Sequence, residues 1–157
     1  MRFVTSAIAT VAFVLIATRP SAQASDPQLG TWVLNVAKST FKPGPPPRSQ
    51  TRKFEQTDRG IRYTSDGVDA DGKPTHSEYL ANFDGKDYAL TGSTQADTIA
   101  LKRMDPWTLE VTQKRAGKIV VTGTRTISKD GRTATVRNKG TDSSGRTLDV
   151  VMVFDKQ

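Results

Sequence analysis

Turn sequences of the Asp-Gly type recur along the chain and separate short segments in which apolar and polar residues alternate. They include Asp66-Gly67, Asp71-Gly72, Asp84-Gly85 and Asp130-Gly131. Such a pair between two alternating segments predicts a β-hairpin, because both residues accept the backbone angles of a tight turn. No window shows the period of an amphipathic helix. We therefore expect an all-β chain.

Successive hairpins without long crossovers predict an antiparallel up-and-down meander. Closure of so many strands into a barrel, of about 8–10 strands, would remove the exposed sheet edges. A sandwich of two sheets is the alternative. Residues 30–36 form the expected first strand, with Trp32 and Leu34 on one face. On a later strand, the alternation places Ile119, Val121 and Ile127 on one face.

The first residues are typical of a secretory signal peptide. Arg2 supplies a positive charge, residues 7–17 are an apolar run too short for a stable membrane span, and residues 22–24 match an Ala-x-Ala cleavage site. We expect residues 1–24 to be removed after Ala24, which leaves no transmembrane anchor. Residues 25–157 are then predicted to form a single β-barrel domain. Its proline-rich connection at residues 42–48 should be extended, because proline lacks the N–H that a sheet ladder needs.

Composition narrows the function classes. The chain has no cysteine, which excludes disulfides, thiolate catalysis and cysteine-based zinc sites, and favours a bacterial periplasm or exterior for an exported protein. The leader holds two of the 23 basic residues and none of the 16 acidic ones, so the remaining 133 residues carry a formal charge of +5. No basic stripe interleaved with aromatic residues is present, so we expect no nucleic-acid partner. The charge is consistent with solubility or with weak contact to anionic envelope polymers.

The Gly30-x-Trp32 opening resembles that of the calycins, the group of lipocalins and fatty-acid-binding proteins, and residues 153–157 resemble their last strand. A resemblance over nearly all of residues 25–157 is to a set of uncharacterised small exported bacterial lipocalin-like proteins. Its matching segments are Gly30-Thr31-Trp32-x-Leu34-Asn35, Lys38-Ser39-x-Phe41, Asp69-x-Asp71-Gly72-Lys73-Pro74, Asp84-Gly85-Lys86-Asp87-Tyr88 and Ser128-Lys129-Asp130-Gly131. The resemblance implies a calycin-like barrel whose apolar lumen holds small hydrophobic molecules.

Two features depart from the calycin pattern. The chain has no room before residues 42–48 for the helix-turn-helix lid of fatty-acid-binding proteins. The arginine that packs on the first-strand tryptophan in lipocalins has no clear counterpart after Phe154.

Seven residues are the candidate ligand contacts: Trp32, Tyr63, Tyr79, Tyr88, Arg103, Trp107 and Arg125. Arg103 shares the face of Leu101, and Arg125 shares the face of Val121, so both arginines are expected to point into the barrel. A charge inside a barrel must be paired or hydrated, and two guanidinium groups near a tyrosine could clamp a carboxylate. The alternatives are a bulge that inverts the strand parity and a position of both arginines at the rim.

No catalytic, metal or cofactor site is predicted. His76 is the only histidine, which argues against a multi-histidine metal site. The cluster of Asp66, Asp69 and Asp71 lacks the glutamate that an EF-hand calcium loop carries at its twelfth position.

These observations favour an exported, non-enzymatic binding protein that holds a small, mostly apolar ligand in the barrel lumen, with a carboxylate-bearing ligand as one option. The alternative is a structural or cell-envelope interaction module with a filled core and a basic surface. An enzyme is the third hypothesis, without a recognised catalytic constellation. A lumen filled by side chains and smaller than ~300 Å³ would speak against ligand binding. The oligomeric state is left open.

Overall fold

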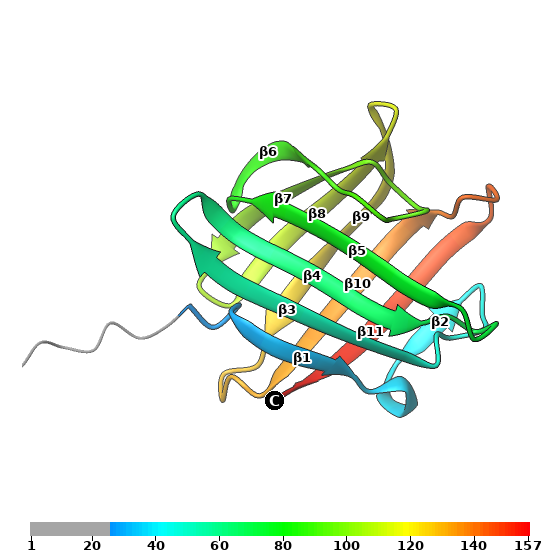
Figure 1. Cartoon of the computed structure of the whole chain (residues 1–157), viewed down its shortest axis with the longest axis horizontal. Coiled ribbons are helices and arrows are strands. Elements are labelled where there is room, and N and C mark those ends of the chain that lie inside the picture. Colours follow the sequence, from blue (N-terminus) through cyan, green and yellow to red (C-terminus); the bar gives the residue numbers. More distant parts are fainter. Residues whose placement is uncertain (1–25) are drawn as a thin grey trace, which may run out of the picture.

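The computed structural model describes residues 26–157, so the predicted signal peptide and its cleavage site lie outside the described residues. The described part contains one short 3-10 helix and a series of antiparallel strands (Figure 1). In chain order these are β1 (Gly30–Leu34), the 3-10 helix η1 (Val36–Lys38), β2 (Thr40–Lys42), β3 (Ser49–Thr57), β4 (Gly60–Val68), β5 (Pro74–Ala81), β6 (Asp84–Ala89), β7 (Thr98–Asp105), β8 (Thr108–Arg115), β9 (Lys118–Ile127), β10 (Thr133–Thr141) and β11 (Thr147–Lys156).

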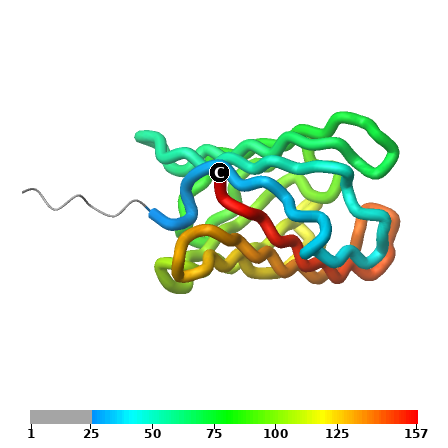
Figure 2. Tube along the Cα trace, turned by 90° about the horizontal axis from the view of Figure 1, so that it is seen from below, coloured from blue at the N-terminus to red at the C-terminus, as the bar shows by residue number. Residues whose placement is uncertain are grey.

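The strands form one sheet in the order β5-β4-β3-β1-β11-β10-β9-β8-β7-β6. The sheet curls into a barrel because β1 pairs with both β3 and β11, so the first and last long segments of the chain lie side by side (Figure 2). The short strand β2 pairs with β11 beyond the end of β1. The predicted antiparallel, calycin-like barrel is therefore confirmed.

The barrel is only loosely joined between β5 and β6. An isolated bridge joins Glu78 of β5 to Thr91, which follows the end of β6: the N–H of Glu78 donates to the carbonyl of Thr91 and the N–H of Thr91 donates back, each at 3.0 Å. The other consecutive long strands are joined by ladders of several residue pairs, with register shifts between β6 and β7, between β7 and β8 and between β8 and β9. The barrel is thus nearly closed, with its weakest seam at β5 and β6.

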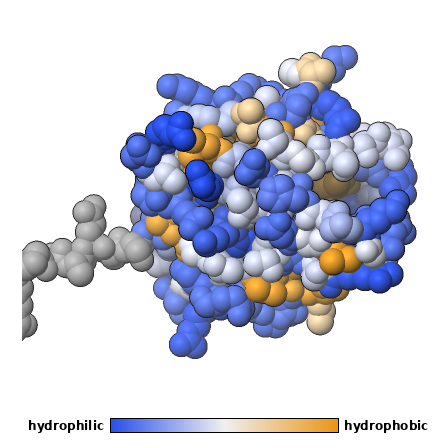
Figure 3. Space-filling view, viewed as in Figure 1, coloured by the Kyte–Doolittle hydropathy of each residue, from blue (hydrophilic) through white to orange (hydrophobic). Residues whose placement is uncertain are grey.

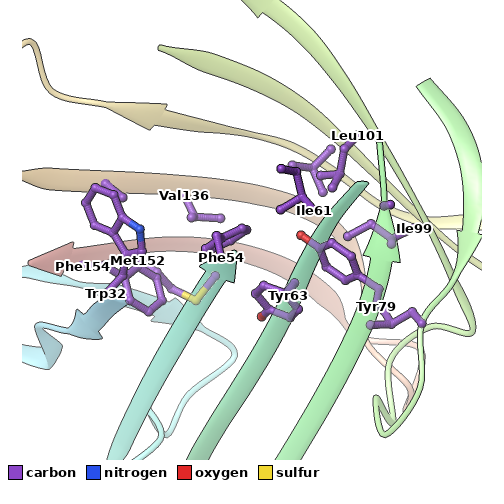
Figure 4. Close-up of a cluster of buried hydrophobic side chains, with 14 of the residues drawn as sticks. Trp32, Phe54, Ile61, Tyr63, Tyr79, Ile99, Leu101, Val136, Met152 and Phe154 are labelled. Atoms are coloured by element: carbon purple, nitrogen blue, oxygen red, sulfur yellow. The ribbon is translucent and has the colours of Figure 1, made fainter. Parts of the chain in front are cut away.

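Inward-facing side chains alternate along each strand and fill much of the interior. Trp32 and Leu109 are fully buried, and Phe154 is almost so. Aromatic side chains from β1, β3, β4, β5 and β11 point toward aliphatic side chains of the facing wall (Figure 4). This period of two is what an antiparallel sheet imposes when one face is buried.

The predicted shared face of Ile119, Val121 and Ile127 is wrong at Ile119. Gln113 of β8 pairs with Val121, but Lys114 pairs with Ile119, so Val120 is an extra residue in β9. This bulge inverts the alternation, and Ile119 is 61% exposed. A count of alternating residues cannot reveal such an insertion.

The first strand is shorter than predicted and ends at Leu34. The side chain of Asn35 accepts a hydrogen bond from the N–H of Lys38 at 3.2 Å, which caps the 3-10 helix and turns the chain away from the sheet. Residues 43–48, within the proline-rich connection, carry no strand and lead to β3.

Gln28 closes the end of the barrel that holds residues 26–29, called here the N-terminal end. Its side chain is fully buried, although it is polar. Its Nε2 donates to the carbonyl of Trp107 at 2.9 Å, and its Oε1 accepts from Nη1 of Arg125. Beside it, the carboxylate of Asp26 forms an ion pair with Arg103. The segment before β1 is therefore part of the barrel core.

Among residues 26–157, no helix has the length and hydrophobicity of a membrane-spanning segment.

The buried amide of Gln28 yields a stability prediction. Gln28→Ala should lower the free energy of unfolding by about 1–3 kcal/mol, because the buried Nη1 of Arg125 loses its side-chain acceptor, Oε1 of Gln28. The carbonyl of Trp107 also loses a donor but keeps the N–H of Ile127 at 2.8 Å. Urea denaturation of the purified protein measures this change. Gln56→Ala, at an exposed position near the end of β3, is the matched control and should change stability little. Equal effects of both substitutions would contradict a structural role of Gln28.

Candidate ligand-binding cavity

A cavity of about 220 Å³ lies inside the barrel, between β3–β5 on one side and β7–β10 on the other. The space-filling view shows a hollow with an apolar floor at the right of the molecule, at the end opposite residues 26–29 (Figure 3). The lining residues are Gln50, Arg52, Phe54, Tyr63, Ser77, Tyr79, Leu90, Ser93, Gln95, Ile99, Leu101, Leu109, Val111, Gln113, Arg125, Val136 and Asn138. The lumen is not filled, but it is smaller than the ~300–1,000 Å³ of typical ligand pockets.

Strand register sorts the lining into layers. On β3, the inward residues from one end of the barrel to the other are Gln50, Arg52 and Phe54. On β10 the inward residue Asn138 lies toward the same end as Gln50, and Val136 lies deeper. Polar side chains therefore gather at one end of the cavity, and apolar and aromatic ones lie toward the N-terminal end.

Three aromatic rings form a wall across neighbouring strands. Phe54 pairs with Tyr63, and Tyr63 pairs with Tyr79, in the register of β3, β4 and β5. The rings of Tyr63 and Tyr79 are stacked with centroids 4.4 Å apart, and Phe54 meets Tyr63 edge-on at 4.9 Å. Burial raises the pKa of Tyr79 above its ordinary value, so its hydroxyl stays protonated and remains a hydrogen-bond donor.

Arg125 is a buried charge at the floor of the cavity, only 4% exposed. Its guanidinium lies 4.1 Å from the ring centroid of Phe54 and 5.0 Å from that of Trp32. Nη1 donates to Gln28, whereas the buried Nη2 has no hydrogen-bond partner within residues 26–157. Burial is the main cause that lowers the pKa of Arg125, and the charge of Arg52 lowers it further.

Arg52 brings a second guanidinium to the cavity. It lies 4.4 Å from the ring centroid of Phe154, and its Nη2 is 3.6 Å from the sulfur of Met152, which is a weak acceptor. Its buried Nε has no partner in the described part of the chain. No ion pair to a carboxylate is formed by Arg52 or Arg125 within residues 26–157.

Two unpaired guanidiniums beside an apolar wall can bind an anion. A buried cation is costly unless an opposite charge or several acceptors compensate it. A carboxylate accepts bidentate hydrogen bonds from guanidinium groups and would meet both positive charges at once. The arrangement suits an amphipathic anion whose apolar part lies against the aromatic wall.

Three of the seven sequence-predicted contacts, Tyr63, Tyr79 and Arg125, line this cavity. Trp32 lies in the core beneath Arg125 and does not line it. The structure places Tyr88, Arg103 and Trp107 elsewhere, so the predicted pairing of Arg103 with Arg125 around one ligand does not form.

The three predicted residues that lie away from the cavity make other contacts. Arg103 pairs with Asp26 and donates to the carbonyl of Pro106 at 3.1 Å. The hydroxyl of Tyr88 donates to Asp84 at 2.9 Å. The ring of Trp107 faces the Lys129 ammonium, 5.1 Å from its centroid.

Sequence reasoning missed Arg52 as the second guanidinium. The alternation of β3, in which Arg52 shares a face with Phe54, was the signal that could have found it. Arg103 instead lies next to a register shift between Arg103 and Asp105, beside the segment that contains Asp26.

A metal centre has no support in the described part of the chain. No group of three metal-ligating side chains occurs within residues 26–157. His76 is exposed, and its Nδ1 lies 2.6 Å from a carboxylate oxygen of Asp66, a hydrogen bond that raises the pKa of His76.

Comparison with solved structures supports the fold. The chain is similar to zebrafish ileal bile acid-binding protein, whose crystal structure is complexed with cholic acid, with a TM-score of 0.52 and 13% sequence identity. The match covers 83% of this chain and 99% of that one. No protein-family model and no curated protein sequence matches the chain. At this identity the likeness concerns the barrel architecture alone.

The unpaired charge of Arg52 yields a second stability prediction. Arg52→Met should raise the free energy of unfolding of ligand-free protein by about 1 kcal/mol, because it removes a partly buried cation and its repulsion with Arg125. The measurement is urea denaturation of protein refolded from denaturant, which removes any retained ligand. Arg62→Met is the control, since Arg62 is exposed on β4. A loss of stability specific to Arg52→Met would contradict this account.

Proposed function

We propose that the protein is an exported, non-enzymatic binding protein that holds a small, largely apolar anion, best a carboxylate, in the barrel lumen. The observation that carries the proposal is the pair of guanidiniums, Arg52 and Arg125, that face one cavity without a carboxylate partner in residues 26–157. The ligand's head group would supply the missing negative charge.

The electrostatics of the lumen support an anionic ligand. Arg125 lies between aromatic rings and against Gln28, which provides dipoles but no charge. Arg52 adds a second positive charge, so the two groups repel each other when the lumen holds no anion. A bound carboxylate would compensate the buried charge of Arg125 and reduce the repulsion between Arg125 and Arg52. The protonated hydroxyl of Tyr79, which lines the same cavity, offers a further hydrogen-bond donor.

The size and lining of the cavity restrict the ligand. At about 220 Å³, the cavity suits a small molecule more than a long acyl chain. An unfilled lumen also argues against the alternative of a structural module with a filled core. The similar zebrafish protein has a barrel of this architecture and is complexed with cholic acid, which is consistent with an organic ligand for this fold.

Carboxylate binding gives the principal test. Hexanoate should bind the wild-type protein at least tenfold more tightly than hexanamide, its neutral analogue, because only the carboxylate compensates the two guanidiniums. Arg125→Met and Arg52→Met should each weaken hexanoate binding by roughly 10- to 100-fold, as expected for hydrogen bonds between charged groups. Isothermal titration calorimetry at fixed ionic strength measures the dissociation constants.

The control for charge in general is Arg62→Met, an exposed arginine whose loss should leave hexanoate binding unchanged. Equal affinity for hexanoate and hexanamide, or an equal effect of all three substitutions, would reject the anion site.

Export is tested separately. Expression of residues 1–157 in a bacterium should yield a periplasmic or secreted protein whose intact mass corresponds to a chain starting at Ser25. Replacing both alanines of the cleavage motif, as Ala22→Glu with Ala24→Glu, should leave the leader attached. A full-length mass for the wild-type protein in the cytoplasm would contradict export.

A further inference from the structure

The polar end of the cavity, formed by Gln50, Ser77, Gln113 and Asn138, is not explained by an apolar ligand with one charged head group. These side chains come from four different strands and line the same cavity as the two arginines. A lumen built only for a carboxylate and a hydrocarbon chain would need apolar residues here.

Asn138 has an unsatisfied acceptor. Its Oδ1 is buried and has no hydrogen-bond partner in residues 26–157. Asn138 pairs directly with Gly123 on β9, and a Cβ built at Gly123 would overlap both Oδ1 of Asn138 and the carbonyl of Arg137. The glycine thus lets the amide lie against the wall of the barrel. A buried polar atom without a partner is uncommon and requires a cause.

The polar side chains around Asn138 differ in whether they already have hydrogen-bond partners. The Nε2 of Gln50 donates to Ser65 at 3.0 Å, so that amide is partly engaged. The side chains of Gln113 and Ser77 form no hydrogen bond with the described part of the chain. With Asn138, they offer both donors and acceptors to the cavity.

We propose that the ligand carries a hydrogen-bonding group, a hydroxyl or an amide N–H, at the end distant from its anionic group, and that Asn138 and Gln113 recognise it. This inference rests on the proposed function, because it assigns the other end of the same ligand. The chemical class is then a short acid with a polar terminus, such as an ω-hydroxy acid.

Strand geometry sets the separation of the two ends. Val136 lies directly opposite Arg125, and Asn138 lies two residues further toward the polar end. Two residues of a strand advance about 7 Å. Gln113 lies four residues along β8 from Leu109, which is itself opposite Arg125. A short chain can therefore contact the guanidiniums and the polar end at the same time.

The test compares two acids that differ only in the distant group. Calorimetric titration with 6-hydroxyhexanoate and with hexanoate should show that the hydroxy acid binds the wild-type protein about 3- to 10-fold more tightly, as expected for one or two neutral hydrogen bonds. Asn138→Leu and Gln113→Leu should bring this ratio close to one while hexanoate affinity is kept. Gln56→Leu makes the same change as Gln113→Leu at an exposed residue near the end of β3 that does not line the cavity, and it should preserve the ratio.

The outcomes separate the two proposals. If hexanoate binds through Arg125 but the hydroxyl brings no gain, or if the gain survives both leucine substitutions, the inference about the polar end is overturned and the anion site stands. If neither acid binds, the proposed function falls and this inference falls with it. Retained hexanoate binding by the leucine variants also shows that they fold.

Discussion

The pairing of β1 with β11 is the constraint on which the rest of the structure depends. It joins the two ends of the described chain and turns a linear meander into a barrel with a defined inside. Once the sheet is closed, every second residue of a regular strand faces the lumen, whatever its chemistry, except where a bulge shifts the register. The interior therefore holds Trp32 and Phe154, but it also holds Arg125.

Closure also explains why the segment before β1 matters. Residues 26–29 lie at the end of the barrel, where Gln28 contacts the carbonyl of Trp107 and the guanidinium of Arg125. The same residue thus helps to close the N-terminal end and to orient the charge at the floor of the cavity. The ion pair of Asp26 with Arg103 keeps the nearest carboxylate engaged outside the lumen, so Arg125 stays available to an anion.

The fold could be predicted from the sequence because alternation and Asp-Gly turns are local signals that agree along the whole chain. The same alternation correctly brought Tyr63, Tyr79 and Arg125 to one lumen. It failed at Ile119, where Val120 forms a bulge, and it could not show that Arg103 would meet Asp26, a contact between distant segments. The alternation places Arg52 on the same face of β3 as Phe54. The residues next to Arg52 in the sequence are polar, however, and gave no indication that its guanidinium is partly buried.

The positions of the buried polar side-chain atoms that lack a hydrogen-bond partner are the strongest argument for ligand binding. The barrel satisfies Gln28, a fully buried polar side chain, and pairs Arg103, so this fold is capable of compensating its own polar groups. Within residues 26–157, four buried side-chain polar atoms lack a hydrogen-bond partner, and three of them belong to Arg52, Arg125 and Asn138, which line one cavity. The fourth, Nε1 of Trp32, lies in the core beneath Arg125. Incomplete packing in general would scatter such atoms through the core. Their concentration around a single space is what a site for an external polar molecule requires, since its donors must stay unpaired until the ligand arrives.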